Sequence, residues 1–154
     1  MSLPNKIPKP DVFLDANVLL AAIFSRTGGA RLILKLAEGG VIQMAVSWQV
    51  LAEVEGALRR KAPETLGHFA LLLDRSRCRV VPNPSPDQIA TYSNVINYRP
   101  DAAVLAAAVA TGADYLVTLD RRHFLNNPRL MKAPPLHIGA PGDFLDWFRQ
   151  QVSG

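Results

Sequence analysis

The sequence is poor in cysteine, in charged residues and in long apolar runs, and each shortage excludes a class of protein. Cys78 is the one cysteine among 154 residues, so the chain forms no internal disulfide and no cysteine-rich zinc site. Charged residues make up 19%, below the roughly 25% usual for soluble domains, whereas apolar residues reach 49%. This composition supplies a full apolar core, which excludes a disordered protein.

The apolar runs are also short. The stretch from Ala102 to Ala110 is far below the roughly 20 residues that a membrane-spanning helix needs. The first ten residues include three prolines, Lys6 and Lys9 and lack the apolar core of a secretory signal. We therefore expect no membrane association, and the lone cysteine favours a reducing, cytoplasmic location.

Short apolar runs alternate with segments of helical period, which is typical of an α/β domain with a parallel sheet. We expect one domain over residues 11–150 after a tail over 1–10, with a central, mostly parallel sheet of about five strands. The strands are expected at 12–14, 41–46, 78–81, 115–118 and 136–138. The helices are expected at 18–24, 30–38, 48–58, 63–74, 87–94, 100–111 and 143–150, the third capped by Ser47.

Acidic residues follow two of these strands. Asp15 comes directly after the first strand, and Asp120 comes two residues after Thr118 at the end of the fourth. Ligands of open parallel sheets bind outside the carboxyl ends of the strands, so both carboxylates belong to one crevice. Carboxylate and water oxygens are the ligands that Mg²⁺ and Mn²⁺ prefer. Each aspartate alone is equally typical of a turn or a helix cap.

Two further positions are candidates on helices. Asp101 follows Pro100 in a first helical turn, where the helix dipole favours a carboxylate with or without a metal. Glu53 and Glu55 lie about 200° apart on the third helix, at 100° per residue, and flank its apolar face. Periodicity does not choose between these two glutamates.

Together these segments resemble the motifs of PIN domains. The similarity covers Asp15-Ala-Asn17 after a strand, the spacing from Ser47 to Glu53, and the block PDAAVLAAAVATGADYLVTLD from Pro100 to Asp120. In one place the chain differs from the commoner pattern, because Leu119 stands where a small residue is frequent.

The resemblance implies a three-layer PIN fold and an endoribonuclease that depends on Mg²⁺ or Mn²⁺. It implies that four acids bind one or two metals, and it favours Glu53 over Glu55: the set is Asp15, Glu53, Asp101 and Asp120. Because toxins of the VapC type belong to this family, it also implies an RNA substrate, a cognate antitoxin protein and a homodimer.

Other residues are assigned supporting roles. Asn17 and Thr118 are expected to support the loops of Asp15 and Asp120, and Arg121 and Arg122 are candidates for contact with a scissile phosphate. Segment 57–79 holds six basic and two acidic residues, enough to account for the net charge of +4, and is either an RNA-binding patch or a solvated hairpin. The histidines, His68, His123 and His137, are interpreted as core or surface residues. Trp48 and Trp147 are interpreted as packing residues rather than platforms for base stacking.

Two alternatives stay open. A Mg²⁺-dependent phosphatase of the haloacid dehalogenase type also has an aspartate after its first strand, but it normally needs a second aspartate at the position of Asn17 and a catalytic lysine. A non-catalytic PIN-like module would bind RNA or a protein without cutting. The presence of all four acids argues against that module.

Overall fold

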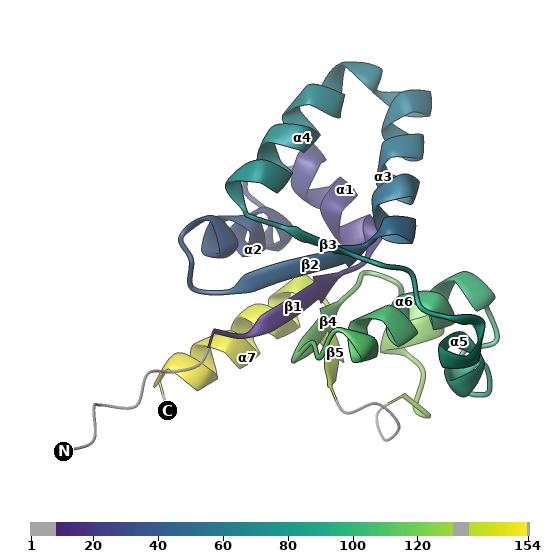
Figure 1. The fold of residues 1–154 in the computed structure, drawn as a ribbon. Coiled ribbons are helices and arrows are strands. Elements are labelled where there is room, and N and C mark those ends of the chain that lie inside the picture. Colours follow the sequence, from purple (N-terminus) through teal and green to yellow (C-terminus); the bar gives the residue numbers. More distant parts are fainter. Residues whose placement is uncertain (1–8, 131–135, 154) are drawn as a thin grey trace.

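The computed structural model describes residues 9–130 and 136–153, so most of the expected tail, residues 1–8, lies outside the described part. A five-stranded sheet forms the middle of the molecule, with strand order β3-β2-β1-β4-β5 (Figure 1). The strands are β1 Asp11–Leu14, β2 Gln43–Ser47, β3 Arg79–Val81, β4 Tyr115–Val117 and β5 His137–Gly139. All four neighbouring pairs are parallel, which confirms the predicted α/β class.

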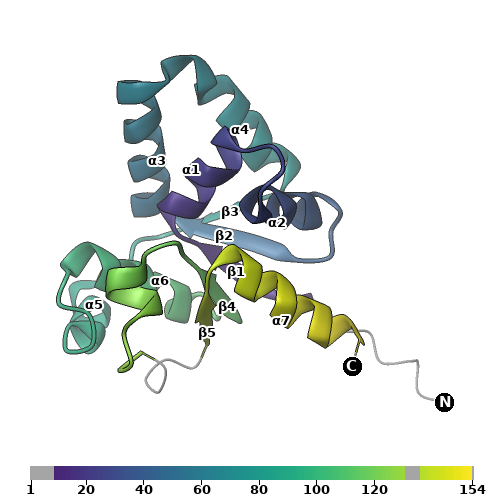
Figure 2. The ribbon, with the colours of Figure 1, turned by 180° about the vertical axis from the view of Figure 1, so that it is seen from behind.

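Helices cover both faces of this sheet (Figures 1 and 2). One face carries the helices before β3, and α3 and α4 form a hairpin that rises away from the sheet beside α1. These helices are α1 Ala16–Phe24, α2 Gly29–Glu38, α3 Trp48–Lys61 and α4 Leu66–Arg75. The other face carries α5 Pro86–Tyr92 and α6 Arg99–Ala110, while α7 Pro141–Ser153 packs against β5 and α2.

The strand order reverses between β1 and β4, because β2 and β3 lie on one side of β1 and β4 and β5 on the other. Such a reversal opens a crevice at the carboxyl ends of the two central strands, where open α/β sheets bind their ligands. Asp15 and Asp120 follow these two strands. The topology alone therefore brings residues 105 positions apart to one edge.

Local sequence explains the helices that flank this crevice. Ser47 caps α3 by accepting a hydrogen bond from the backbone N–H of Val50, as predicted, and Val50, Val54 and Leu58 bury one stripe of that helix. In α6 the proline lies in the first turn and every residue from 102 to 108 is buried. An almost wholly apolar helix is stable here because it lies between the sheet and α5.

Three segments differ from the prediction in more than a small shift of their ends. The helix expected at 63–74 is a 3-10 turn, Pro63–Thr65, followed by α4, because Ala62 leaves helical geometry with φ −154° and ψ 63° before the proline. After Asp120, where no helix is expected, the chain forms a π-helical turn, Arg121–Leu125. The last helix is longer than expected and begins at Pro141.

The two tryptophans differ. Trp147 packs as predicted, with its ring centroid 5.3 Å from that of Tyr115 and 5.9 Å from that of Phe144. The packing role predicted for Trp48 is wrong, because its side chain is 56% exposed. As the first residue of α3 it lies about 200° from Val50 and so points away from the buried stripe.

Among the described residues, no single helix is long and apolar enough to cross a membrane; α1 and α2 meet that test only as a pair bent by 94°.

Candidate functional site

A cavity of about 430 Å³ opens at the carboxyl edge of the sheet, between α1 and α3. The four acids predicted from the sequence all line it, although they come from the end of β1, from α3, from α6 and from the end of β4. The described lining residues are Asp15, Ala16, Asn17, Leu20, Ala52, Glu53, Gly56, Ala57, Arg60, Asp101 and Asp120. Glu55 is not among them, so the geometry separates the two glutamates that periodicity left equivalent.

Asp15 is the most deeply buried of these acids, with 5% of its surface exposed. Its Oδ1 accepts a hydrogen bond from the N–H of Ala16 at 2.8 Å, and its Oδ2 accepts one from the hydroxyl of Thr118 at 2.8 Å. Burial raises the pKa of the Asp15 carboxyl; these two hydrogen bonds oppose that rise, and the charges of Glu53 and Asp120 add to it. Both carboxylate oxygens therefore have partners supplied by the fold itself.

Thr118 and Asn17 connect the first strand to the loop after the fourth. While its hydroxyl donates to Asp15, the oxygen of Thr118 accepts from the N–H of Asp120 at 3.1 Å. Asn17 receives the N–H of Leu119 on Oδ1 at 3.0 Å, and its Nδ2 lies 3.5 Å from Oδ2 of Asp15. The side chain of Leu119 is exposed, so its size does not displace this loop.

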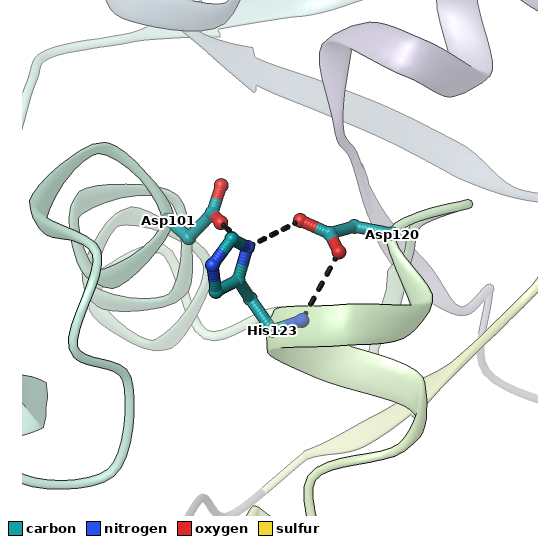
Figure 3. Close-up of side chains that lie close together, drawn as sticks. All are labelled: Asp101, Asp120 and His123. Carbon is teal, nitrogen blue, oxygen red and sulfur yellow. Dashed lines mark hydrogen bonds and ion pairs between the residues drawn. The ribbon is translucent and has the colours of Figure 1, made fainter.

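Asp101, Asp120 and His123 form a second cluster in the same crevice (Figure 3). Nδ1 of His123 lies 2.7 Å from Oδ2 of Asp101 and 3.0 Å from Oδ2 of Asp120. The backbone N–H of His123 also donates to Oδ1 of Asp120 at 3.1 Å. One imidazole nitrogen thus lies between two carboxylates that would otherwise repel each other.

The two carboxyl groups differ in pKa. Burial, followed by repulsion from Asp120, raises the pKa of Asp101 to about 7. Burial also opposes ionisation of Asp120, but hydrogen bonds from the backbone and ring of His123 and from Asp101 outweigh it and lower the pKa of Asp120. Near neutral pH the Asp120 carboxyl is therefore ionised and the Asp101 carboxyl is partly ionised, so the pair carries a net negative charge.

The interpretation of His123 as a core or surface residue is wrong. Its ring is 28% exposed and stacks on Tyr98, with centroids 5.1 Å apart and planes 17° apart, so it is held in place beside the two acids. The turn that carries it is closed by backbone bonds that span five residues, such as N–H of Asn126 to the carbonyl of Arg121 at 2.7 Å. The spacing Asp120-x-x-His123 was the available signal, because residues three apart share one face of a helical turn.

The second cluster fits a divalent cation. Oδ2 of Asp101 is buried and makes no hydrogen bond of proper geometry, which is costly for a carboxylate oxygen without a cation. One ligand atom from each of Asp101, Asp120 and His123 lies within 4.8 Å of the other two. Carboxylates suit Mg²⁺ and Mn²⁺, and the added imidazole is a ligand better suited to Mn²⁺ than to Mg²⁺.

Glu53 lies on the α3 wall of the cavity. Its Oε1 is 3.5 Å from Nε2 of Gln49, and the same amide donates to the carbonyl of Pro100 at 3.0 Å. Gln49 therefore ties the start of α3 to the start of α6. This contact fixes the wall that bears Glu53 relative to the helix that bears Asp101.

The two arginines proposed for phosphate contact lie outside the acidic cavity. Arg121 and Arg122 are exposed on the π-helical turn, and Arg122 lines a separate cavity of about 360 Å³. His123 borders that second cavity as well, so the two cavities meet at the cluster of Asp101, Asp120 and His123.

A family described as PIN domain matches residues 11–122 of the chain, which is more than half of its length. No curated protein sequence gives a significant match.

Three solved structures are similar in fold. VapBC2 from Rickettsia felis, bound to a DNA fragment from its promoter, has 18% identity and a TM-score of 0.60, covering 83% of this chain and 96% of that one. PAE2754 from Pyrobaculum aerophilum has 17% identity and a TM-score of 0.63, covering 94% and 91%. A toxin–antitoxin complex from Klebsiella pneumoniae has 19% identity and a TM-score of 0.60, covering 84% and 97%.

Proposed function

The chain belongs to the PIN-domain family, and from that premise we propose that it is a metal-dependent endoribonuclease that hydrolyses RNA phosphodiester bonds. The observation that carries the proposal is the contact of Asp101 and Asp120 through one nitrogen of His123, with a buried carboxylate oxygen of Asp101 left without a well-formed hydrogen bond. Two acids held this close form a cation site, and the cavity beside them is open to a polymer backbone.

We assign the cation to Asp101, Asp120 and His123, with Asp15 and Glu53 as the remaining acidic ligands around the cavity. A bound Mg²⁺ or Mn²⁺ would lower the pKa of its water and neutralise charge on the phosphoryl group. His123 adds an imidazole to a carboxylate set, so we expect Mn²⁺ to bind more tightly than Mg²⁺.

The protein's own residues hold this arrangement in place. Thr118 orients Asp15 and the backbone of Asp120 at once, and Asn17 holds the N–H of Leu119. Arg122, in the neighbouring cavity, is placed to bind a phosphate or base on the far side of His123. Because Asp15 already has hydrogen-bond partners, it keeps its position when RNA enters the crevice.

We further propose that the chain is the toxin of a toxin–antitoxin pair, acting in the cytoplasm and forming a homodimer. Support comes from the family and from fold neighbours crystallised as VapBC or toxin–antitoxin complexes. A small antitoxin gene next to this one, and co-purification of its product with this chain, would test the partner.

The phosphatase alternative finds no support among the residues described. The position that would need a second aspartate is Asn17, whose side chain binds the backbone of Leu119, and the described lining of the cavity contains no lysine.

The experiment is a cleavage assay with labelled single-stranded RNA and matching DNA, in Mn²⁺, in Mg²⁺ and in EDTA. We expect metal-dependent cutting of RNA that is lost in Asp15→Asn and Asp101→Asn, with circular dichroism unchanged. Binding of RNA without cutting in any metal would select the non-catalytic module instead.

A further inference from the structure

The wall of the acidic cavity contains one basic side chain among the described residues, Arg60. It belongs to the basic segment 57–79, whose other described basic residues do not line this cavity. Arg60 is exposed, so it can be solvated, it can neutralise one of the four acids, or it can receive an anion. The contacts of Arg60 show whether it neutralises an acid.

Arg60 makes no ion pair and no side-chain hydrogen bond with any residue in the described ranges, 9–130 and 136–153. Other groups lie nearer to the carboxylates of the crevice: the Thr118 hydroxyl donates to Asp15, Nδ1 of His123 lies within 3.0 Å of Asp101 and Asp120, and Nε2 of Gln49 lies 3.5 Å from Glu53. The guanidinium is therefore not used to balance the acids, and its donors stay available to a ligand.

The position of the guanidinium follows from helix geometry. Residues 53, 56, 57 and 60 share one face of α3, since they are three or four apart. Side chains in a helix lean toward its N-terminus, so Arg60 extends back over Gly56, toward the turn that bears Glu53. A methyl group at Gly56 would lie 3.3 Å from Nη1 of Arg60, which is its nearest contact outside the adjacent residues and the backbone of α3.

Gly56 is the second observation. A glycine inside a helix is less favourable than alanine, and its backbone here is ordinary helix without a positive φ. Apart from its chain neighbours and the backbone of α3, the atom nearest to the space above it is Nη1 of Arg60. Gly56 thus lets Nη1 of Arg60 lie close to α3 at the edge of the cavity.

We propose that Arg60 and Gly56 form a phosphate-binding subsite that receives an RNA backbone phosphate next to the one that is cleaved. This inference rests on the proposed function, because it assigns the substrate path of the same cavity. A planar guanidinium with free donors binds two phosphate oxygens at once, which a lysine does not. RNA would then cross the acids with one phosphate held on the α3 side.

The competing explanation is that Arg60 stabilises the C-terminal end of α3 by its charge. Arg59 and Lys61 lie in the same last turn and would do the same. They do not line the cavity, so Arg59→Ala is a matched control that removes an equal charge from the same helix end.

The test measures binding of labelled single-stranded RNA by fluorescence anisotropy at several salt concentrations, with every variant built on Asp101→Asn to prevent cutting. For Arg60→Ala we expect affinity to fall on the order of tenfold, the size of one charge-assisted contact. The slope of log Kd against log salt should drop by about 0.7, the value for one phosphate on a single strand. Arg59→Ala should change neither the affinity nor the salt slope by a comparable amount.

Gly56→Ala gives a second, independent readout. Its methyl group would come within 3.3 Å of Nη1, so the guanidinium must shift by a few tenths of an ångström. We expect RNA to bind more weakly, by a smaller factor than in Arg60→Ala, while the thermal midpoint rises. A merely structural role of Arg60 predicts the higher midpoint without the loss of affinity, and that result would overturn the subsite.

The outcomes separate the subsite from the nuclease. Equal affinity and slope for Arg60→Ala and Arg59→Ala, in a protein whose parent chain cuts RNA, overturns the subsite alone. A parent chain that cuts no RNA but shows the Arg60 slope change supports the subsite and refutes the nuclease. If the chain binds no RNA, both the subsite and the nuclease function are refuted.

Discussion

The acidic crevice has two halves that differ in how their carboxylates are stabilised. The β1 half consists of Asp15, Asn17 and Thr118, and the α6 half consists of Asp101, Asp120 and His123. In the β1 half each carboxylate oxygen receives a protein donor. In the α6 half two carboxylates share one imidazole nitrogen, and a buried oxygen of Asp101 has no well-formed hydrogen bond.

This difference identifies where a cation belongs. A carboxylate whose hydrogen bonds are complete is stabilised by the fold, whereas a close pair of carboxylates with an incomplete set is stabilised by a positive charge. We therefore propose that the β1 half acts as a fixed wall and the α6 half as the primary cation site. The variants that follow change one half at a time.

The largest expected effect is on catalysis, from Asp120→Asn in the α6 half. Loss of this charge should lower the rate of RNA cleavage by at least about 10²- to 10³-fold, because the cation loses a ligand and its charge is no longer matched. The assay is single-turnover cleavage in Mn²⁺. Glu55→Gln, on the same helix as Glu53 but outside the cavity, should cut normally. Equal losses in both variants would contradict the assignment.

In the β1 half, loss of a hydrogen-bonding group should lower the free energy of unfolding. Thr118→Val keeps the shape of the side chain but removes the hydroxyl, leaving Oδ2 of Asp15 and the N–H of Asp120 without that partner. We expect the free energy of unfolding to fall by about 1–3 kcal/mol, measured in urea without metal. Thr118→Ser keeps the hydroxyl and should lose much less. A stable Thr118→Val protein would show that the β1 half does not depend on this network.

In the α6 half, loss of a carboxylate should instead raise the free energy of unfolding. The pKa of Asp101 is about 7 in the folded chain, against an ordinary value of 3.8 for an aspartate. The folded form therefore takes up a proton that the unfolded form has already lost, and stability falls as pH rises from about 4 to 7. Asp101→Asn removes this cost, so without metal it should be more stable at pH 8 by about 1–2 kcal/mol, a value discounted for partial solvent exposure.

That gain should disappear toward pH 4, where the Asp101 carboxyl is protonated in the folded chain and close to half protonated in the unfolded one. Unfolding midpoints of the parent chain and of Asp101→Asn across this pH range are the measurement. A constant difference between them at all pH values would mean that the charge of Asp101 is not the cause.

The smallest expected effect is a change in stability caused by a substitution on the α3 wall of the cavity. Gly56→Ala should raise the free energy of unfolding by about 0.5–1 kcal/mol through helix propensity, measured by urea denaturation. At the same time it should weaken RNA binding through displacement of Arg60. Ala57→Gly, the neighbouring exchange on the same wall, should lower stability without moving that guanidinium.

Much of the fold was predictable because its signals are local. Ser47 before an apolar stripe predicted the start of α3, and Pro100 before a run of small apolar residues predicted α6. The parallel sheet followed from the alternation of strands and helices. The placement of Asp15 and Asp120 at one edge followed from the rule for the carboxyl ends of strands.

The candidate site was predictable only in part. His123 was missed because five residues of π-helical turn have no period that a sequence pattern reveals, and the ring is positioned by the distant residues Tyr98 and Asp101. Arg60 could not be singled out among its basic neighbours, since the direction of its side chain depends on the space above Gly56. The position of His123 depends on contacts between elements, and that of Arg60 on which face of α3 borders the cavity.

The central claim is that the α6 half holds a divalent cation. Titration calorimetry of Mn²⁺ into the parent chain, Asp101→Asn and Glu55→Gln, all in one neutral buffer, tests it most directly. We expect saturable binding to the parent chain and to Glu55→Gln, with affinity at least about tenfold weaker in Asp101→Asn. Equal Mn²⁺ affinity in all three proteins would contradict it.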